Sequence, residues 1–595
     1  MYMIEENKDI TPMTTFGIPV KARYFVEYSS ERELLHLSRQ DVFLNNEVLH
    51  IGGASNLLFL NDYDGLVLHS GIKGIKRYEK DPDTVFVIAG AGEKWTDLVE
   101  WSIAEGLAGL ENLAGIPGEV GASAIQNVGA YGVEAGERIH AVECFDTITR
   151  TTRRFTREEC RFGYRDSFFK HEGKGRFIVL RVSYRLFPDG KARSLDYGPL
   201  RDLAARLGRE PSIREVAYEV IKVRDSKLPD PAEIGSAGSF FKNPVLPEKY
   251  FHSLVDICGE EMPVYPAGEG KVKLSAAWLI DHAGMKGHRC GGAEVYGKQP
   301  LVIVNAGGAT GEDVARLAEE VREAVRRKFL INLKPEVNYI DTRIHVTVLG
   351  SGTSKGVPEI GCRCHVCLSP DEKDKRLRAS VLVRTAGMTI LIDPSPDFRE
   401  QALRENLTDI DAVLITHIHY DHVGGIDDLR PFCGWNDLPM YAREDVSSDL
   451  KRRLDYCFRE HPYPGVPSFD MKVISNHPFY IRGLKVEPVE VYHGKKAIFG
   501  YRIGKFAYIT DAKSIDEVEK DKLRGLDVLI VNALRDKEHF AHFTLAEALA
   551  LIEEVKPREA YLTHFNHEIG RHKELESRLP AYVHAAFDGL KIEVE

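Results

Sequence analysis

The chain has 595 residues, which is too long for one hydrophobic core, so we expect two to four domains. With 43% hydrophobic and 28% charged residues it has the composition of an ordinary globular protein, and its net charge of -11 argues against a general binder of nucleic-acid backbones. No apolar run approaches the ~20 residues of a membrane helix, and residues 1–10 lack the layout of a signal peptide, so a cytoplasmic protein is expected.

A glycine-rich turn follows a strand early in the chain. Residues 47–51 have the pattern of a strand, and residues 52–56 read Gly-Gly-Ala-Ser-Asn. Glycines directly after a strand let backbone N–H groups approach a pyrophosphate closely, and the serine and asparagine add side-chain donors. A plain tight turn would use the same residue types, so this turn alone is a weak signal.

A second glycine cluster strengthens the prediction. Residues 109–121 are rich in glycine and lead into residues 126–132, which read Gln-Asn-Val-Gly-Ala-Tyr-Gly. So many glycines and amides predict a backbone shaped around a large, flat, polar ligand. The spacing is not the G-x-G-x-x-G of a Rossmann nucleotide site.

The first part of the chain ends near residue 341. Residues 311–329 predict an amphipathic helix, because Val314, Leu317, Val321 and Val325 share one face. A short tail follows, and a new apolar strand begins at residues 345–349. We therefore place the domain boundary at residues 341–344.

The two glycine clusters resemble those of the UDP-N-acetylenolpyruvoylglucosamine reductases, flavoenzymes with a vanillyl-alcohol-oxidase-type FAD domain. Further segments that match in family order are residues 163–167, 195–198, 224–230, 235–244, 277–280 with 291–293, and 334–337. The resemblance covers about residues 10–340. It departs at Ala54, where the family usually has glycine; alanine should be tolerated there if its φ is negative.

The resemblance implies that NADPH reduces FAD, and that the flavin then reduces the enolpyruvyl ether of a UDP-sugar to UDP-N-acetylmuramate for peptidoglycan synthesis. By resemblance, Arg165 and Glu336 flank the reacting enol and Ser239 donates the proton that quenches the carbanion. The implied FAD-binding residues are Gly52, Gly53, Ala54, Ser55, Asn56, Gly118, Gly121, Ala122, Asn127 and Gly129. The implied substrate-binding residues are Tyr164, Tyr197, Arg224, Lys227 and Asn243.

Tyr197 further implies the reductase variant that closes a tyrosine-bearing loop over its substrate. The alternative for this half is a flavin oxidase that acts on another alcohol or sugar.

Metal chemistry is predicted for the second part of the chain. Fourteen of the 22 histidines follow Ile344. Residues 412–416 predict a buried parallel strand, and the motif His417-Ile-His419-Tyr-Asp421-His422 comes directly after it. Residues two apart in an extended chain point the same way, so the rings of His417 and His419 share a direction, while Asp421 and His422 would serve a second ion. Unpaired buried histidines are costly, so a purely structural role is disfavoured.

This motif resembles that of the metallo-β-lactamase superfamily. By resemblance, His493 would complete the first metal site, Asp511 would bridge the two ions and His564 would close the second site. The implied dinuclear ligand set is His417, His419, Asp421, His422, His493, Asp511 and His564. Zinc is expected from the histidines, with manganese allowed by the carboxylates. A pair of metal ions ~3.5–4 Å apart suits hydrolytic attack on an ester or phosphodiester.

Three crowded cysteines predict a separate zinc site. In a reducing compartment such crowding favours metal over disulfides, and Cys362, Cys364, Cys367 and His567 would form a closed Cys₃His structural site. The cluster is similar to that of the phosphonate-pathway cyclic phosphodiesterases. By that comparison His542 protonates the leaving group, with His539 as the alternative.

The predicted fold class is multidomain α/β and α+β: an FAD domain with a substrate domain, then an αββα metallo-β-lactamase sandwich. The predicted domains are residues 1–75 and 76–220 (FAD-binding subdomains), 221–341 (substrate binding) and 345–595 (hydrolase). We expect a bifunctional chain whose second half is a phosphodiesterase. A nuclease, a thioesterase or a docking module remain alternatives, although a nuclease would need a basic arm that is not evident.

Overall fold

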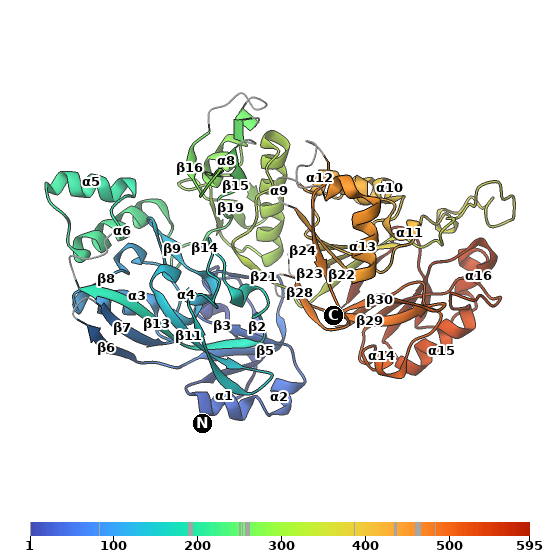
Figure 1. The fold of residues 1–595 in the computed structure, drawn as a ribbon, viewed down its shortest axis with the longest axis horizontal. Coiled ribbons are helices and arrows are strands. Elements are labelled where there is room, and N and C mark those ends of the chain that lie inside the picture. The colour runs from blue at the N-terminus through green and yellow to red at the C-terminus, as the bar shows by residue number, and fades with distance from the viewer. Residues whose placement is uncertain are drawn as a thin grey trace. The chain divides into compact units, whose positions relative to one another are not determined.

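The computed structural model divides the chain into two compact units, Met1–Asp341 and Thr342–Glu595 (Figure 1). The structure describes residues 2–81, 84–188, 194–248, 251–252, 254–255, 262–385, 387–433, 437–458, 466–481 and 484–594. No helix of the described residues is long and apolar enough to cross a membrane.

The first unit begins with a four-stranded sheet in the order β1-β2-β5-β3. Its strands are β1 (Glu5–Asp9), β2 (Lys21–Tyr28), β5 (Tyr63–Ser70) and β3 (Val48–Ile51), and its helices are α1 (Glu31–Leu37) and α2 (Asp41–Leu44). β3 and β2 both pair in parallel with β5, and Ile51 lies opposite His69. The end of β3 therefore carries the first glycine turn.

A second, antiparallel sheet has the order β12-β11-β13-β7-β6. Its strands are β6 (Ile75–Asp81), β7 (Thr84–Gly90), β11 (Ile139–Asp146), β12 (Thr151–Thr156) and β13 (Phe177–Pro188), with β8 (Leu107–Ala108) beside β13 and a separate pair β9 (Gly129–Ala130) and β10 (Val133–Glu134). Helices α3 (Trp95–Ala104) and α4 (Val120–Gln126) contribute Trp95, Leu98 and Val120 to its core. The second glycine cluster leads into α4.

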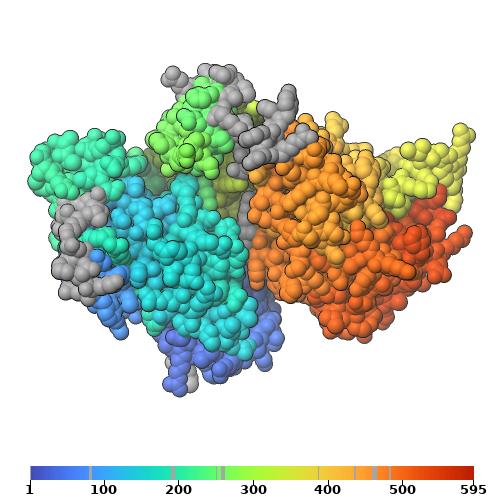
Figure 2. All heavy atoms as spheres, viewed as in Figure 1, coloured from blue at the N-terminus to red at the C-terminus, as the bar shows by residue number. Residues whose placement is uncertain are grey.

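Two helices form a lobe beside these sheets. They are α5 (Gly198–Leu207) and α6 (Ile213–Lys227), and the lobe stands out on the surface of the first unit (Figure 2). A capping box at Ser212 and Glu215 begins α6. Tyr197 is the residue that precedes α5, so it lies at the base of this lobe.

The remainder of the first unit carries the long helix. Its elements are β14 (Gly235–Ser239), β15 (Val245–Pro247), β16 (Val264–Pro266), β17 (Lys271–Leu274), α8 (Ala276–His282), β18 (Arg289–Cys290), β19 (Ala293–Val295), β20 (Val302–Asn305) and α9 (Gly311–Phe329). α9 confirms the predicted helix, and its face of Val314, Leu317 and Val321 is buried. The tail forms β21 (Asn338–Ile340), which pairs in parallel with β4 (Leu57–Phe59).

The second unit contains two seven-stranded sheets among its described residues. The first has the order β27-β26-β25-β24-β23-β22-β35: β22 (Ile344–Gly350), β23 (Ser380–Thr385), β24 (Met388–Ile392), β25 (Ala412–Leu414), β26 (Leu438–Ala442), β27 (Phe469–Val473) and β35 (Lys591–Val594). The second has the order β28 to β34: β28 (Phe479–Ile481), β29 (Leu484–His493), β30 (Lys496–Ile503), β31 (Phe506–Ile509), β32 (Val528–Asn532), β33 (Glu559–Thr563) and β34 (Val583–Ala585).

The two sheets of the second unit share one core between them. Val346 and Val383 of the first sheet cluster with Val486, Tyr501 and Ile530 of the second. The helices on the outer faces are α10 (Phe398–Arg404), α11 (Tyr420–Val423), α12 (Arg430–Cys433), α13 (Glu444–Arg453), α14 (Glu517–Asp521), α15 (Leu545–Val555) and α16 (His572–Glu576). The layers are therefore αββα, which confirms the predicted fold class.

The strand order explains where polar groups gather in this unit. β24 to β27 run parallel to one another in the first sheet, and β31 to β34 do so in the second. The loops that leave the carboxyl ends of parallel strands meet at one edge, where α/β layers hold their sites. The predicted strand at residues 412–416 is confirmed as β25, although it ends at Leu414.

Candidate functional sites

The two glycine clusters of the first unit lie against each other. A Cβ atom added to Gly53 would lie 3.1 Å from Cα of Gly118, and one added to Gly118 would lie 3.1 Å from Oγ of Ser55. Ser55 Oγ donates a hydrogen bond to the carbonyl of Pro117 (3.2 Å). Side chains at these two glycines would therefore force the loops apart. The close backbone approach is what a site for a diphosphate requires.

The condition under which Ala54 was expected to be tolerated is not met, because its φ is +39° and not negative. Ala54 is also buried, so its methyl group is fixed in the core below the turn. A left-handed backbone brings Cβ too close to the neighbouring carbonyl and costs a non-glycine residue about 1–2 kcal/mol. Ala54 is therefore strained in a turn where the resembling family usually has glycine.

We expect Ala54→Gly to stabilise the first unit by up to about 0.5 kcal/mol, because relief of the left-handed strain exceeds the sum of the extra unfolded-state entropy of glycine and the lost burial of the methyl group. The unfolding midpoint, followed by circular dichroism at one FAD concentration, should rise. Ala217→Gly is the matched control, since Ala217 is a buried alanine inside α6, where glycine costs about 0.5–1 kcal/mol. A lower midpoint for Ala54→Gly than for the wild type would contradict the strain.

Arg165 occupies the centre of the predicted catalytic group. Its Nε lies 2.9 Å from Oε1 of Glu336, and its Nη1 lies 3.5 Å from Oε1 of Glu134. Its backbone is left-handed (φ +54°), and its carbonyl accepts hydrogen bonds from the ammonium groups of Lys170 (3.2 Å) and Lys242 (3.3 Å). Burial, followed by the charge of Lys242, lowers the pKa of Lys170 to about 8. Arg165 is therefore held at its guanidinium by the two glutamates and at its backbone carbonyl by the two lysines.

A backbone hydrogen bond of the residue after Ser239 brings Ser239 near Glu336. It is the last residue of β14, and the N–H of Glu336 donates to the carbonyl of Phe240 (2.8 Å). Asn56 of the first glycine turn donates to the carbonyl of Glu336 (3.0 Å). The structure thus joins the predicted catalytic residues to the predicted cofactor turn. Their roles stay predictions.

Only some of the predicted substrate-binding residues contact one another or a shared neighbour. Burial raises the pKa of Tyr164, which is hydrogen-bonded to Asn243. The ring of Tyr197 meets that of Tyr131 edge-on, with centroids 5.2 Å apart. Burial lowers the pKa of Arg224, next to the same Tyr131. Lys227 lies one turn further along α6 and is exposed.

Sequence reasoning assigned no role to several residues around Arg165. Lys242 lies inside the matching segment 235–244, so a signal for it was present. Glu134 and Lys170 stand alone in the sequence and carry no motif. Asn127, which was predicted to bind FAD, is 1% exposed and donates to Oε2 of Glu134 (2.8 Å).

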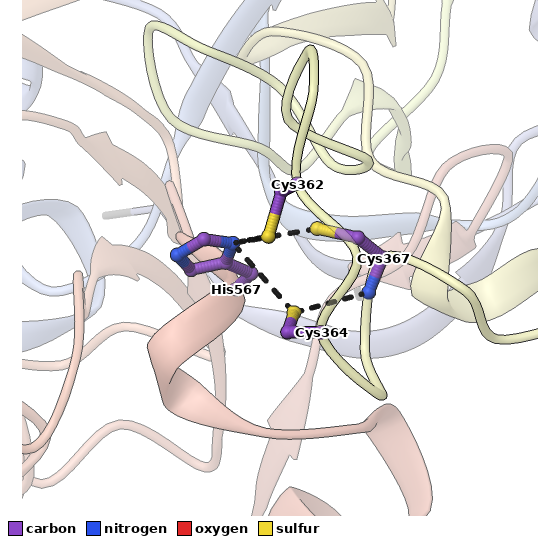
Figure 3. Close-up of side chains that lie close together, drawn as sticks. All are labelled: Cys362, Cys364, Cys367 and His567. Atoms are coloured by element: carbon purple, nitrogen blue, oxygen red, sulfur yellow. Dashed lines mark hydrogen bonds between the residues drawn. The ribbon is translucent and has the colours of Figure 1, made fainter.

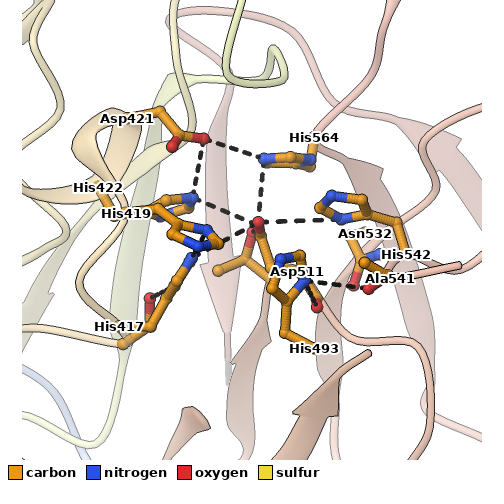
Figure 4. A network of polar contacts seen from close by, with 12 residues as sticks. His417, His419, Asp421, His422, His493, Asp511, Asn532, Ala541, His542 and His564 are labelled. Atoms are coloured by element: carbon orange, nitrogen blue, oxygen red, sulfur yellow. Dashed lines mark hydrogen bonds and ion pairs between the residues drawn. The ribbon is translucent and has the colours of Figure 1, made fainter. Parts of the chain in front are cut away.

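The predicted metal ligands of the second unit converge on Asp511 (Figure 4). Three groups have ligand atoms within 4.8 Å of one another: Asp421, His422, Asp511 and His564; His417, His419 and Asp511; and His493, Asp511 and His542. Nε2 of His417 lies 3.0 Å from Nδ1 of His419. Two imidazole nitrogens on one tetrahedral zinc would lie about 3.3 Å apart, given Zn–N bonds of about 2.0–2.1 Å.

The two carboxylate oxygens of Asp511 face different groups. Oδ1 lies 3.1 Å from Nε2 of His564 and 3.3 Å from Nε2 of His422. Oδ2 lies 3.7 Å from Nε2 of His417 and 3.8 Å from Nδ1 of His542. Burial opposes its ionisation, but the surrounding histidines outweigh burial and hold the pKa of Asp511 well below its usual range. A carboxylate placed in this way could contact one metal ion through each of its oxygens.

Outer contacts orient the candidate ligands. Nδ1 of His422 donates to Asp393 (2.7 Å), which also accepts from the N–H (2.8 Å) and the hydroxyl (2.7 Å) of Thr416. Nδ1 of His493 donates to the carbonyls of Asp511 (2.8 Å) and Ala541 (3.0 Å). Such contacts fix the ring and leave the other nitrogen for a metal. Sequence reasoning missed Asp393, although it directly follows the buried strand β24.

Several buried nitrogens here have no hydrogen-bond partner among the described residues: Nε2 of His422, both ring nitrogens of His564 and Nδ1 of His542. An unsatisfied buried polar group costs about 1–3 kcal/mol. Burial lowers the pKa of His542 to about 3, which keeps its ring neutral. Buried imidazole nitrogens that make no hydrogen bond and lie beside carboxylates fit divalent metal ions.

The cysteine cluster also converges, on a different histidine (Figure 3). Nδ1 of His567 lies 3.3 Å from Sγ of Cys362, 3.8 Å from Cys364 and 3.3 Å from Cys367. A tetrahedral zinc with Zn–S bonds of about 2.3 Å would place these atoms about 3.5 Å apart. The four side chains therefore fit a closed Cys₃His site.

His542 and His539 remain alternative proton donors. The ring of His542 stacks on His564, with centroids 5.0 Å apart, and meets His493 at 4.7 Å. The ring centroid of His539 lies 4.9 Å from that of His542, and Nδ1 of His539 accepts a hydrogen bond from the N–H of Ala541 (3.3 Å). His542 also belongs to a candidate metal group, whereas His539 belongs to none of those found in the described residues.

Three families match the chain. Residues 22–151 match "FAD binding domain", residues 230–340 match "UDP-N-acetylenolpyruvoylglucosamine reductase, C-terminal domain", and residues 388–565 match "Beta-lactamase superfamily domain". The first unit is thus an FAD-binding oxidoreductase, and the second is a hydrolase domain of the metallo-β-lactamase fold.

Relatives identify the first unit more closely. The UDP-N-acetylenolpyruvoylglucosamine reductase of Neisseria gonorrhoeae is 44% identical over 344 residues, which is 58% of this chain and 99% of the relative. That of Porphyromonas gingivalis (strain W83) is 42% identical over 337 residues, 57% of this chain and 99% of the relative. The chain belongs to the UDP-N-acetylenolpyruvoylglucosamine reductase family. Its first unit carries out the NADPH-dependent reduction of that family.

Solved structures resemble each unit. A "New Diphosphatase from the PhnP Family" is 44% identical and covers 42% of this chain and 97% of its own, with a TM-score of 0.40. The UDP-N-acetylenolpyruvylglucosamine reductase of Thermus caldophilus is 26% identical and covers 57% of this chain and 100% of its own, with a TM-score of 0.41.

Proposed function

We propose that Arg165, Glu336 and Ser239 carry out the chemistry of the reductase unit. When bound, FAD that NADPH has reduced supplies the hydride. Arg165 offsets the negative charge that develops on the substrate carboxylate, and Glu336, at 2.9 Å, holds its guanidinium in place. Ser239 delivers the proton that quenches the carbanion. The contact between Arg165 and Glu336 is the observation that carries this assignment.

Around this centre, we propose that the two glycine clusters hold FAD and that Tyr164, Tyr197, Arg224, Lys227 and Asn243 hold the UDP-sugar. Cationic side chains suit the diphosphate of the substrate. We further propose that residues 1–75 and 76–220 form two FAD-binding subdomains and that residues 221–341 form the substrate domain.

For the second unit, we propose a dinuclear metal site that hydrolyses a phosphodiester. The observation that carries it is Asp511, whose two oxygens face two separate ligand groups. When bound, a pair of zinc or manganese ions would supply an activated hydroxide and Lewis-acid stabilisation. His417, His419 and His493 would hold one ion, and Asp421, His422 and His564 the other.

The remaining groups of the second unit receive supporting roles. His542 would give a proton to the leaving group; because burial lowers its pKa to about 3, it would first take up that proton during the reaction. Asp393 would fix the ring of His422 through its hydrogen bond with Nδ1. Cys362, Cys364, Cys367 and His567 would hold a structural zinc that fixes the loop next to His564.

The test is a metal analysis of the full chain combined with a hydrolysis screen. Purified without chelators, the chain should contain about three metals, two in the dinuclear site and one in the cysteine site. Bis(4-nitrophenyl) phosphate, a cyclic phosphate, ADP-ribose, a thioester and a β-lactam should be compared with Mn²⁺ or Zn²⁺ present. Cys364→Ser should lower the zinc content by about one. Fewer than two metals per wild-type chain, or preference for the thioester, would contradict the proposal.

A further inference from the structure

Glu119 belongs to the second glycine cluster of the reductase unit, and its side chain lies against the first. It follows Gly118 directly, and a Cβ atom added to Gly52 would lie 3.2 Å from Oε2 of Glu119. Its side chain is only 10% exposed. The carboxylate is therefore packed against the turn where we have proposed that the cofactor diphosphate lies.

One oxygen of this carboxylate is paired. Oε1 lies 2.9 Å from Nε2 of His69, and Nδ1 of the same ring lies 2.8 Å from Oε2 of Glu27. Both ring nitrogens face carboxylates, which only accept hydrogen bonds, so the ring is an imidazolium. Burial disfavours this charge, but Glu119 and Glu27 outweigh it and raise the pKa of His69.

The second oxygen of Glu119 has no partner. Oε2 is fully buried and has no hydrogen-bond donor among the described residues. His69 is already committed to Oε1 and to Glu27. One cation between two carboxylates leaves a net negative charge behind the glycine turn. A buried ionised oxygen without a donor is costly, and a cofactor phosphate next to it would increase that cost through repulsion.

The chemistry of FAD offers donors at this position. The ribityl chain and the ribose are attached on either side of the diphosphate, and both carry hydroxyl groups. A hydroxyl can donate to Oε2, which a phosphate cannot do. We propose that Glu119 is an FAD-binding residue that accepts a hydrogen bond from a cofactor hydroxyl and is oriented for this contact by His69. The inference rests on the proposed FAD site at the glycine clusters.

The experiment measures FAD dissociation from the full-length chain by flavin fluorescence. Glu119→Gln keeps the shape but replaces one acceptor oxygen with an amide donor. Loss of a hydrogen bond to a charged acceptor should raise the dissociation constant about 10- to 100-fold. An unchanged constant, or tighter binding through removal of a charge near the phosphates, would overturn the proposal.

Smaller ligands identify the donor. FMN carries the ribityl chain and ADP carries the ribose, so competition by each compound shows which hydroxyl is involved. Weaker binding of either one to Glu119→Gln supports the proposal. Weakening of neither would overturn it.

Control variants separate the possible failures. Glu105→Gln changes a carboxylate that is 41% exposed and pairs with Arg77, so it should leave FAD binding unchanged. Gly53→Ala tests the glycine site itself, because the added methyl would press on Gly118. If Gly53→Ala weakens binding and Glu119→Gln does not, only the role of Glu119 is wrong; if neither does, the proposed FAD site is wrong as well. If Glu119→Gln does not fold, Glu119→Asp, which withdraws the carboxylate, takes its place with the same expected loss.

Discussion

Asp511→Asn should abolish metal-dependent hydrolysis by the second unit while the reductase keeps its full rate. The substitution keeps the shape of the side chain but removes the charge that faces His564 and His422 through one oxygen and His417 through the other. An amide cannot bridge two cations as a carboxylate does. We expect at least one metal ion to be lost and hydrolysis of bis(4-nitrophenyl) phosphate to fall by about 10³-fold or more.

The measurements for this variant are metal content by mass spectrometry and the rates of both activities. Reductase turnover is the internal control, because Asp511 lies in the other compact unit. Asp521→Asn is the matched control, since Asp521 is a largely exposed carboxylate at the end of α14. Hydrolysis by Asp511→Asn at the wild-type rate would eliminate a mechanism with a bridging carboxylate.

Ser239→Ala should slow the oxidative half-reaction of the reductase without affecting the reductive one. The hydroxyl is needed only when the carbanion takes up its proton, so reduction of the flavin by NADPH should keep its rate. Reoxidation by UDP-N-acetylenolpyruvoylglucosamine should slow by about 10²–10⁴-fold, the usual contribution of a positioned general acid. Stopped-flow absorbance of the flavin measures each half-reaction separately.

Ser226→Ala is the matched control for this experiment. Ser226 lies on α6 and its hydroxyl bonds only the carbonyl of Val223 among the described groups, so both half-reactions should keep their rates. Equal slowing of both half-reactions by Ser239→Ala would indicate a disturbed fold or flavin site. Unchanged reoxidation would assign the proton to another group.

Patterns within short segments determined much of the fold. α9 was predicted over residues 311–329 and has those bounds, because its apolar spacing and the cap at Thr310 are local features. The strand at the start of the second unit was predicted as residues 345–349 and lies within β22. The glycine clusters and the His417–His422 motif are likewise contained in single segments.

Local conformation was less predictable where the tertiary structure imposes it. Alanine was expected to be tolerated in the first glycine turn if its φ were negative, yet Ala54 has a φ of +39°. The reason is the turn's contact with the second cluster, where Gly53 and Gly118 meet. A sequence pattern contains no information about that contact, so the strain is visible only in the folded chain.

By itself, the sequence determined the types of chemistry in this protein: glycine turns suited to a dinucleotide, a histidine-rich motif after a buried strand, and crowded cysteines. Only the tertiary structure decided which distant groups meet. Asp393 follows β24 of one sheet, and Asp511 and His564 follow β31 and β33 of the other, so strand order and the packing of the two sheets together bring these loops to one edge. Glu119 likewise meets His69 only because the start of α4 is packed against β5 in the folded unit. Backbone sterics act over a few residues, whereas the positions of charges relative to one another depend on how the whole sheet is assembled.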